Sequence, residues 1–448
     1  MPQLSEHPTV VQFWQRQTPG SLPEPPQQLD VAWLRQMCLE AGAEDVGFVQ
    51  LGRPELANQR EDILRAFPFT RTLISFVLRM RRENIRTPAR SVANLEFHHT
   101  GEEVNEVGRR IVTELESRGV RAANGAAVGF PMEMDRWPGK AWVVSHKPVA
   151  VAAGLGHMGI HRNVIHPRFG NFILLGTVVT EAEVSSQSRP IDYNPCLECK
   201  LCVSACPTGA ISPDGQFNFA ACYTHNYREF MGGFTDWVEN VADSKNARDY
   251  RKRVSDPETV SMWQSLGFGP NYKAAYCLSV CPAGEDVIAP FLTDRKQYLH
   301  DVVKPLQSKA ETIYVRAGSD AEEYVRRRLP GKKTKRVGNG IRPRSIDQFL
   351  GGLAFTFERG KAEGVRATYH FTFTGSAERK ATVAIEDGQL RVEEGHTGTS
   401  DLRITADTDS WLRFLAKEHS VVWALLTRKI RLSGSPRLLL TFARCFAA

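Results

Sequence analysis

One run of cysteines constrains this chain more than any other feature. The stretch Cys196-Leu-Glu-Cys199-Lys-Leu-Cys202-Val-Ser-Ala-Cys206-Pro207 has the spacing C-x2-C-x2-C-x3-C-P. Such short spacings let one tight loop present three thiolates to three corners of an iron–sulfur cubane, while the fourth cysteine points away and binds a different cluster. A zinc site more often uses two C-x-x-C pairs well apart in the sequence. The run therefore predicts iron–sulfur clusters in this part of the chain.

A second, degenerate half of the motif ends in the same way, at Cys277-Leu-Ser-Val-Cys281-Pro282. Two such halves are related by pseudo-symmetry, so each half should lend its last cysteine to the cluster of the other. We therefore expect a first [4Fe-4S] cluster bound by four cysteines, namely Cys196, Cys199, Cys202 and Cys281.

The second cluster has only three obvious thiolates. These are Cys206, Cys222 and Cys277, and the fourth ligand would fall three residues before Cys277, where the chain has Ala274. Three alternatives are open. The site holds a [3Fe-4S] cluster, or a [4Fe-4S] cluster with an exchangeable or non-cysteine ligand such as His225, or it is partly or wholly empty. The second alternative is our working hypothesis.

The 448 residues include 42% hydrophobic and 24% charged residues, which is enough apolar surface for two to four hydrophobic cores. The fold class that the pattern predicts is an α/β N-terminal domain followed by a bacterial ferredoxin-like module and a C-terminal α+β domain. The expected boundaries are an N-terminal arm over 1–27, the α/β domain over 28–185, the ferredoxin-like iron–sulfur domain over 186–295, a basic linker over 296–344 and the α+β domain over 345–448.

Charge and hydropathy exclude several classes of protein. The net charge of +7 is mild, and much of it lies between Arg326 and Arg344. This stretch reads as a solvated linker, or else as a docking strip for an acidic partner. No nucleic-acid-binding motif accompanies it, so nucleic acid is not an expected partner. No apolar run reaches the ~20 residues of a membrane span. The N-terminal residues lack a secretion signal, so we expect a cytoplasmic protein.

The α/β domain, the cysteine layout and a Gly-rich segment together resemble the epoxyqueuosine reductase family and the related core of reductive dehalogenases. The segment is Ala152-Ala-Gly154-Leu-Gly156-His-Met-Gly159, and the resemblance covers roughly residues 28–295. It implies cobalamin held at Gly154, Gly156 and Gly159 beside one cluster. It also implies a ferredoxin, flavodoxin or reductase as the electron donor.

The chain departs from this family at the proton donor. The family carries an Asp upstream of the Gly-rich run, and the matching position here is Ser145. Candidate acids near the expected pocket are Asp135, His146 and His157, with Glu133 as a further carboxyl. Ala274 is a second departure, because the family has Cys there. Both departures make tRNA queuosine maturation a doubtful function for this chain.

The C-terminal domain resembles the sterol-carrier-protein-2-like fold. The matching features include Tyr369-His-Phe-Thr-Phe-Thr-Gly375, the turn Asp387-Gly388 and Lys429-Ile-Arg-Leu-Ser-Gly434. The resemblance implies a five-stranded sheet and helices around an apolar tunnel for a hydrophobic ligand. The alternative is that aromatic side chains simply fill the core; these are Phe371, Trp411, Phe414 and Trp423.

Two functional hypotheses follow. The leading one is an iron–sulfur oxidoreductase that passes low-potential electrons from [4Fe-4S] clusters to a bound cofactor, with cobalamin as the candidate, and to a small, hydrophobic organic substrate. The alternative is a ferredoxin-like electron carrier or sensor with a lipid-binding or docking domain and no catalysis of its own.

Overall fold

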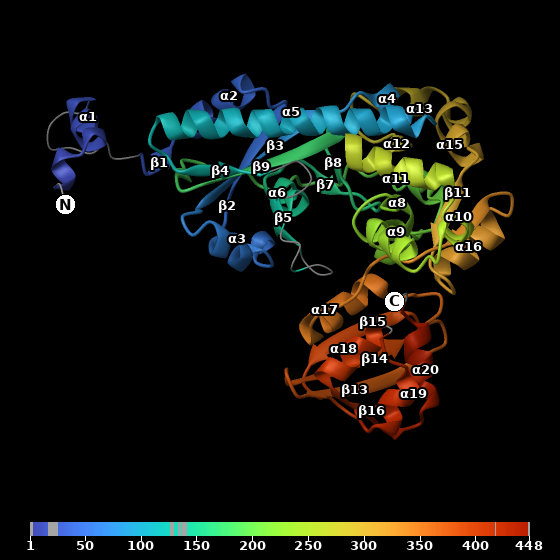
Figure 1. The fold of residues 1–448 in the computed structure, drawn as a ribbon. Helices are drawn as coiled ribbons and strands as arrows, with labels where there is room; N and C mark the ends of the chain where they lie inside the picture. Colours follow the sequence, from blue (N-terminus) through green and yellow to red (C-terminus); the bar gives the residue numbers. More distant parts are fainter. Residues whose placement is uncertain are drawn as a thin grey trace.

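The computed structural model describes residues 3–16, 26–125, 130–132, 136, 141–416 and 418–446. It contains an N-terminal sheet region, a helical region that carries the clustered cysteines, and a C-terminal sheet domain (Figure 1). A short helix, α1 (Pro8–Arg16), lies apart from these three bodies. Within the described residues, no helix combines the length and the apolar character that a membrane crossing requires.

The N-terminal sheet has the strand order β2-β3-β9-β4, and all its neighbouring strands run antiparallel. The strands are β2 (Asp45–Gln50), β3 (Thr72–Arg79), β4 (Ala122–Asn124) and β9 (Ile173–Thr180). Strand β9 follows the Gly-rich segment and the short strand β8 (Val164–Ile165), and it pairs with β3 along its whole length. The sheet therefore fixes the position of the Gly-rich segment and of the cysteine run that follows.

Helices on the sheet form where apolar spacing predicts them. Helix α2 (Val31–Glu40) begins at Asp30, whose Oδ1 accepts a hydrogen bond from Trp33 N at 2.8 Å. This N-cap satisfies an otherwise unpaired amide and confirms the predicted start. Helix α5 (Arg90–Ser117) lies along the sheet (Figure 1). Its stripe is buried as predicted, namely Val104, Val107, Ile111 and Leu115.

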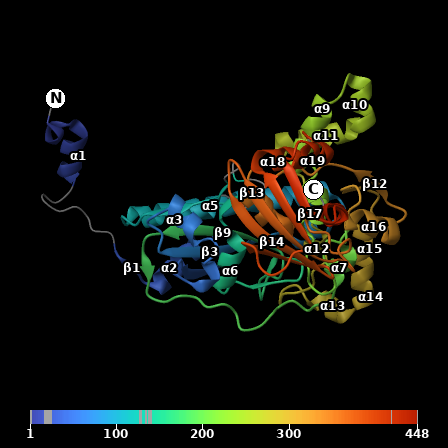
Figure 2. The same cartoon turned by 90° about the horizontal axis from the view of Figure 1, so that it is seen from below.

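The cysteine-bearing region consists of short helices joined by irregular loops. They are α7 (Leu201–Ala205), α8 (Phe219–Asn226), α9 (Gly232–Ala242), α10 (Ala247–Arg253), α11 (Asp256–Phe268), α12 (Tyr276–Ser279), α13 (Ala289–Thr293) and α14 (Arg295–Tyr298). Helix α6 (His146–Ala152) comes before them and packs on the N-terminal sheet. Helices α9, α10 and α11 project to one side of the molecule (Figure 2). Such weakly periodic structure is expected where a bound cluster replaces part of the hydrophobic core.

The segment over 296–344 is folded, although the sequence suggested a linker. It contains α15 (Lys304–Ser308), β11 (Thr312–Val315), α16 (Asp320–Arg328) and β12 (Lys333–Arg336), and β11 pairs in parallel with β12. Ile313 and Val315 are buried. The basic side chains suggested a solvated linker because their acidic partners are not their neighbours in the sequence. In the fold, four of them form ion pairs: Lys332–Glu311, Lys335–Glu258, Arg336–Glu322 and Arg342–Glu239.

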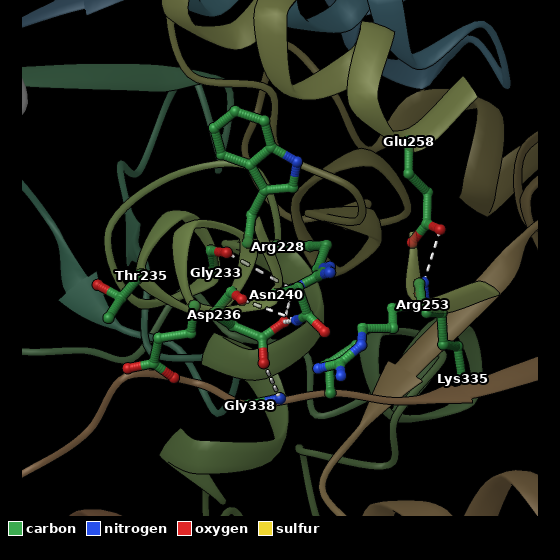
Figure 3. A network of polar contacts seen from close by, with 12 residues as sticks. Arg228, Gly233, Thr235, Asp236, Asn240, Arg253, Glu258, Lys335 and Gly338 are labelled. Carbon is green, nitrogen blue, oxygen red and sulfur yellow. Dashed lines mark hydrogen bonds and ion pairs between the residues drawn. The ribbon is translucent and has the colours of Figure 1, made fainter. Parts of the chain in front are cut away.

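A buried polar network ties this segment to α9 (Figure 3). Arg228 forms an ion pair with Asp236 at 2.6 Å, and both side chains are almost completely buried. The second carboxylate oxygen of Asp236 accepts a hydrogen bond from Gly338 N at 2.6 Å. The carboxylate therefore satisfies a backbone amide of the basic segment as well as a guanidinium.

The C-terminal sheet has the order β15-β14-β13-β16-β17. Its strands are β13 (Arg366–Thr374), β14 (Arg379–Glu386), β15 (Gln389–Glu394), β16 (Leu402–Asp407) and β17 (Ile430–Gly434). This five-stranded sheet agrees with the predicted fold. The turn between β14 and β15 has Asp387 at φ 46° and Gly388 at φ 75°, which confirms the predicted hairpin.

Four helices accompany the C-terminal sheet: α17 (Ile346–Thr356), α18 (Thr408–Leu415), α19 (Val421–Leu426) and α20 (Arg437–Arg444). Aromatic rings fill the space between helices and sheet. Trp411 packs at 5.5 Å from Phe349 and at 5.7 Å from Phe371, and Phe371 packs at 5.4 Å from Phe442. This interior agrees with the alternative in which aromatic side chains form an ordinary core.

Candidate iron–sulfur and ligand site

One group of thiols surrounds a small cavity between the cysteine run and the loop that follows α12. The four side chains are those of Cys196, Cys199, Cys202 and Cys281. The pKa of Cys281 is raised first by burial, and the negative charge of the other three thiols raises it further. The structure thus brings together the four residues that the sequence analysis assigned to the first cluster.

A second group of thiols lines a much larger cavity of about 900 Å³. It consists of Cys206, Cys222 and Cys277. Burial raises the pKa values of Cys222 and Cys277, and the charge of Cys206 acts on both thiols in the same direction. Ala274 lies on the wall of the same cavity. Cys202 of the first group also responds to the charge of Cys277. The two groups are therefore neighbours, as a two-cluster arrangement requires.

The two cysteine loops repeat one backbone geometry. Lys200 at φ 61° begins α7, and Ala275 at φ 56° begins α12, so each short helix follows a left-handed residue. Cys202 and Cys277 occupy the same position, two residues after that left-handed residue. The loops are thus related as the sequence spacing predicted.

Close backbone approach holds the Cys281 loop against the N-terminal domain. Gly170 has φ 64°, and a Cβ atom added there would collide with the carbonyl oxygen of Ala283. Only glycine allows this contact. Cys281 is followed at once by Pro282 and Ala283, so the contact positions the fourth thiol of the first group.

The protein environment disfavours free thiolates. Burial raises the pKa of Cys202 to about 12 and that of Cys277 to about 11. Iron must therefore displace these protons, which couples cluster assembly to folding. Within the described residues, no three His, Cys, Asp or Glu side chains converge on one ion-sized position.

Polar side chains from α6 and the following loop face the second group of thiols. Lys147 Nζ donates to Arg162 O at 2.8 Å and to Asn163 Oδ1 at 2.9 Å. Asn163 Nδ2 in turn lies 3.9 Å from Cys277 Sγ. Burial lowers the pKa of Lys147, while the charges of Cys277 and Cys222 act in the opposite direction. Lys147 and Asn163 thus place a cation and an amide beside this thiol group.

His161 lines both cavities and stays neutral. Burial lowers its pKa to about 4, and the charge of Lys147 lowers it further. Its Nδ1 accepts a hydrogen bond from Asn163 N at 3.1 Å, and its Nε2 lies 3.2 Å from the side chain of Asn171. Both ring nitrogens are therefore engaged in holding the loop between the two thiol groups.

The C-terminal domain supplies part of the cavity wall. Ala354 and Phe355 of α17 line the cavity, and the Phe355 ring packs at 5.2 Å from Phe219 of α8. Helix α8 also carries Cys222. One helix therefore connects the C-terminal domain with the second thiol group.

Comparison with known proteins agrees with this arrangement. Residues 189–212 match the 4Fe-4S binding domain family, and residues 355–447 match the SCP-2 sterol transfer family. An epoxyqueuosine reductase of Bacillus anthracis is 33% identical over 133 residues, which are 26% of this chain and 34% of that protein. The chain is an iron–sulfur protein related to the epoxyqueuosine reductases.

Other relatives show how far this similarity extends. An epoxyqueuosine reductase of Lactococcus garvieae is 35% identical over 77 residues, 17% of this chain and 21% of its own length. The solved epoxyqueuosine reductase of Streptococcus thermophilus is 15% identical with a TM-score of 0.35, and the match covers 61% of this chain and 75% of that chain. The chain thus matches 34% and 21% of the length of these two curated epoxyqueuosine reductases.

The glycines that the resemblance to epoxyqueuosine reductases assigned to cobalamin pack against the protein itself. A Cβ atom added at Gly154 would collide with Arg189 O, one at Gly156 would lie 2.5 Å from Ile165 O, and one at Gly159 would lie 2.7 Å from the His161 ring. None of the three glycines lines the large cavity. These glycines therefore allow the Gly-rich segment to pack closely against the backbone and side chains around it.

The proton-donor candidates lie in different places. His146 is buried, and its Nδ1 lies 2.8 Å from Thr177 Oγ1. His157 Nδ1 lies 3.1 Å from Met158 O, so it donates to that carbonyl. Neither histidine lines the large cavity. Asp135 and Glu133 fall outside the described residues.

Sequence reasoning did not single out Lys147 or Asn163. Lys147 follows His146 in a His-Lys-Pro stretch, and Asn163 follows the Gly-rich segment. One signal was available, because Lys147 comes two residues after Ser145, the position of the family's acid. Only the fold shows that these side chains meet beside Cys277.

Proposed function

We propose that this chain is an iron–sulfur oxidoreductase that reduces an organic molecule bound next to its second cluster. Cys196, Cys199, Cys202 and Cys281 would hold a [4Fe-4S] cluster, and Cys206, Cys222 and Cys277 would hold the other. Iron–sulfur clusters transfer single electrons, and their reduction potentials span a wide range that the surrounding protein sets. The observation that carries the proposal is the cavity of about 900 Å³, onto which the second thiol group opens.

We infer the direction of electron flow from what lies beside each thiol group, an exposed loop beside the first and the large cavity beside the second. Leu197, inside the first cysteine loop, is 44% exposed, and Cys196 and Cys199 are partly exposed. The first cluster would therefore receive electrons from a donor protein that contacts this loop. The second cluster, on the cavity wall, would deliver them to the bound molecule.

The C-terminal domain would help to hold a hydrophobic molecule by closing this cavity. Its own interior is filled by aromatic rings, whereas Phe355 contributes its ring to the wall beside α8. We infer that this domain acts through α17. A lipid tunnel inside the sheet is not needed for that role.

Cobalamin is the cofactor that the resemblance implies, and it would supply a low-potential metal centre. Its predicted glycines face other parts of the chain, so the space for it in the described structure is the cavity beside Lys147 and Asn163. The cobalt content of anaerobically purified protein tests this part of the proposal. If the protein contains no cobalt after reconstitution with cobalamin and gel filtration, cobalamin is not its cofactor. The iron–sulfur assignment would not be affected by that result.

The competing function is an electron carrier without its own substrate. A carrier exchanges electrons only with protein partners and has no use for the cavity. Ala354→Trp would fill the cavity from α17 without touching a cysteine. We expect the reduced Ala354→Trp protein to keep its iron, and to lose oxidation by small organic acceptors that oxidise the wild-type protein. Equal oxidation of both proteins would favour the carrier.

A further inference from the structure

We propose that the second cluster binds its ligand directly, because the chain leaves one corner of that cluster without a side chain at Ala274. The ligand would be an anionic oxygen donor, such as a carboxylate, on an apolar body. This inference rests on the proposed function and names the class of molecule that the cavity receives.

The backbone shows that Ala274 occupies a ligand position. In the first half, Cys199 immediately precedes the left-handed residue Lys200. In the second half, Ala274 immediately precedes the left-handed residue Ala275. Ala274 is therefore the structural counterpart of Cys199, and its methyl group stands where the fourth thiol would be.

His225, the other candidate for the fourth ligand, lines the cavity but is engaged with β11. Its Nδ1 accepts a hydrogen bond from Tyr314 N at 3.3 Å, and its Nε2 is buried without a partner among the described residues. Its ring also stacks on the ring of Tyr314 in β11, with the two centroids 6.0 Å apart. The hydrogen bond and the stacking hold the imidazole against β11, which leaves the corner at Ala274 to a ligand from the cavity.

Other polar side chains near this corner are already engaged. Asn226 Oδ1 accepts a hydrogen bond from Ala274 N at 3.0 Å. Tyr223 accepts one from Gly232 N at 2.8 Å. Burial raises the pKa of Tyr227 and of Tyr272, so both phenols stay protonated and are weak ligands. The fourth corner is thus open to the cavity.

The charge beside this corner favours an anion. An ammonium group has three N–H donors, and Lys147 directs two of them to Arg162 O and Asn163 Oδ1. In the described part of the chain, no carboxylate pairs with Lys147. A negatively charged ligand would neutralise this cation on the cavity wall and accept its third N–H.

The rest of the cavity suits an apolar body. Its walls include the aromatic rings of Phe97, Phe217, Phe219, Tyr272 and Phe355. Since aromatic walls with a few placed polar groups are typical of small-molecule pockets, the oxygen donor would lie at the cluster and the apolar body against these rings.

The test uses benzoate as the probe and the full-length, anaerobically reconstituted protein. Carboxylate labelled with oxygen-17 should broaden the EPR signal of the reduced second cluster, because the labelled oxygen would bind its iron. Mild oxidation should release one iron per chain and leave a three-iron signal. Ala274→Cys should abolish both effects, since its thiol would close the fourth corner.

A matched variant separates ligand binding from cluster assembly. Lys147→Gln should retain the oxidative loss of one iron and bind benzoate about tenfold more weakly, because a charge-assisted hydrogen bond is lost. If the second cluster of the wild-type protein gives an EPR signal that neither benzoate nor oxidation changes, this inference is wrong and the proposed function still stands. Absence of any second-cluster signal would overturn the proposed function as well.

Discussion

Glu358, two residues after α17, accepts a hydrogen bond from Asn218 Nδ2 at 3.2 Å across the boundary between the C-terminal domain and the cysteine-bearing region. Asn218 is also the N-cap of α8, where its Oδ1 accepts a hydrogen bond from Ala221 N at 2.8 Å. Because α8 carries Cys222, this one amide connects the C-terminal domain with the second thiol group.

This contact predicts a pH-dependent stability. Burial, and after it the charge of Asp320, raise the pKa of Glu358 from 4.5 to about 7. A carboxyl whose pKa is higher in the folded protein stabilises the fold below its ordinary pKa. That contribution is lost as the pH rises through about 7, and it amounts to at most about 3 kcal/mol. We expect the melting temperature of the holoprotein to fall between pH 5 and pH 8.

Glu358→Gln is the control for this prediction. The amide has the shape of a protonated carboxyl and does not titrate, so the melting temperature of this variant should change much less over the same range. Arg359 and Lys361 form ion pairs with Asp214 and Glu323 nearby, and these pairs are retained in the variant. An equal slope in both proteins would assign the pH dependence to other groups.

Sequence reasoning succeeded where a signal is local. The Asp30 cap, the apolar stripe of α5 and the Asp387-Gly388 turn each depend on residues only a few positions apart. It failed over 296–344, where Lys335 and Arg336 look like solvated charge until the fold supplies Glu258 and Glu322 as partners. The contact between Lys147 and Asn163 is also tertiary, so spacing alone does not reveal it.

Two buried cysteines should respond differently to removal of their sulfur. Cys202 belongs to the first thiol group, whereas Cys38 lies in the core of the N-terminal domain. We expect Cys202→Ala to lose about four iron atoms per chain, the content of one cubane. Cys38→Ala should keep its iron and lose only about 1 kcal/mol of unfolding free energy, because it removes a small apolar contact. Iron and sulfide analysis measures the difference.

The ion pair between Arg228 and Asp236 should matter far more than an exposed pair on the same helix (Figure 3). Asp236→Asn would leave a buried guanidinium without its partner, at a cost of about 3–5 kcal/mol. Arg342→Gln breaks the exposed pair with Glu239 and should cost less than about 1 kcal/mol. Chemical unfolding of the two variants side by side measures both values. Similar losses would contradict the importance of burial here.

Gly170→Ala tests whether the N-terminal domain positions the first cluster. The added Cβ would collide with the carbonyl oxygen of Ala283, and the positive φ of 64° adds strain for any residue with a side chain. We expect the Cys281 loop to shift and the iron content of the first site to fall, while the second cluster keeps its EPR signal. Gly52→Ala is the matched control, because a Cβ there meets nothing within 4 Å. Full iron in Gly170→Ala would show that the Cys281 loop holds its place without this contact.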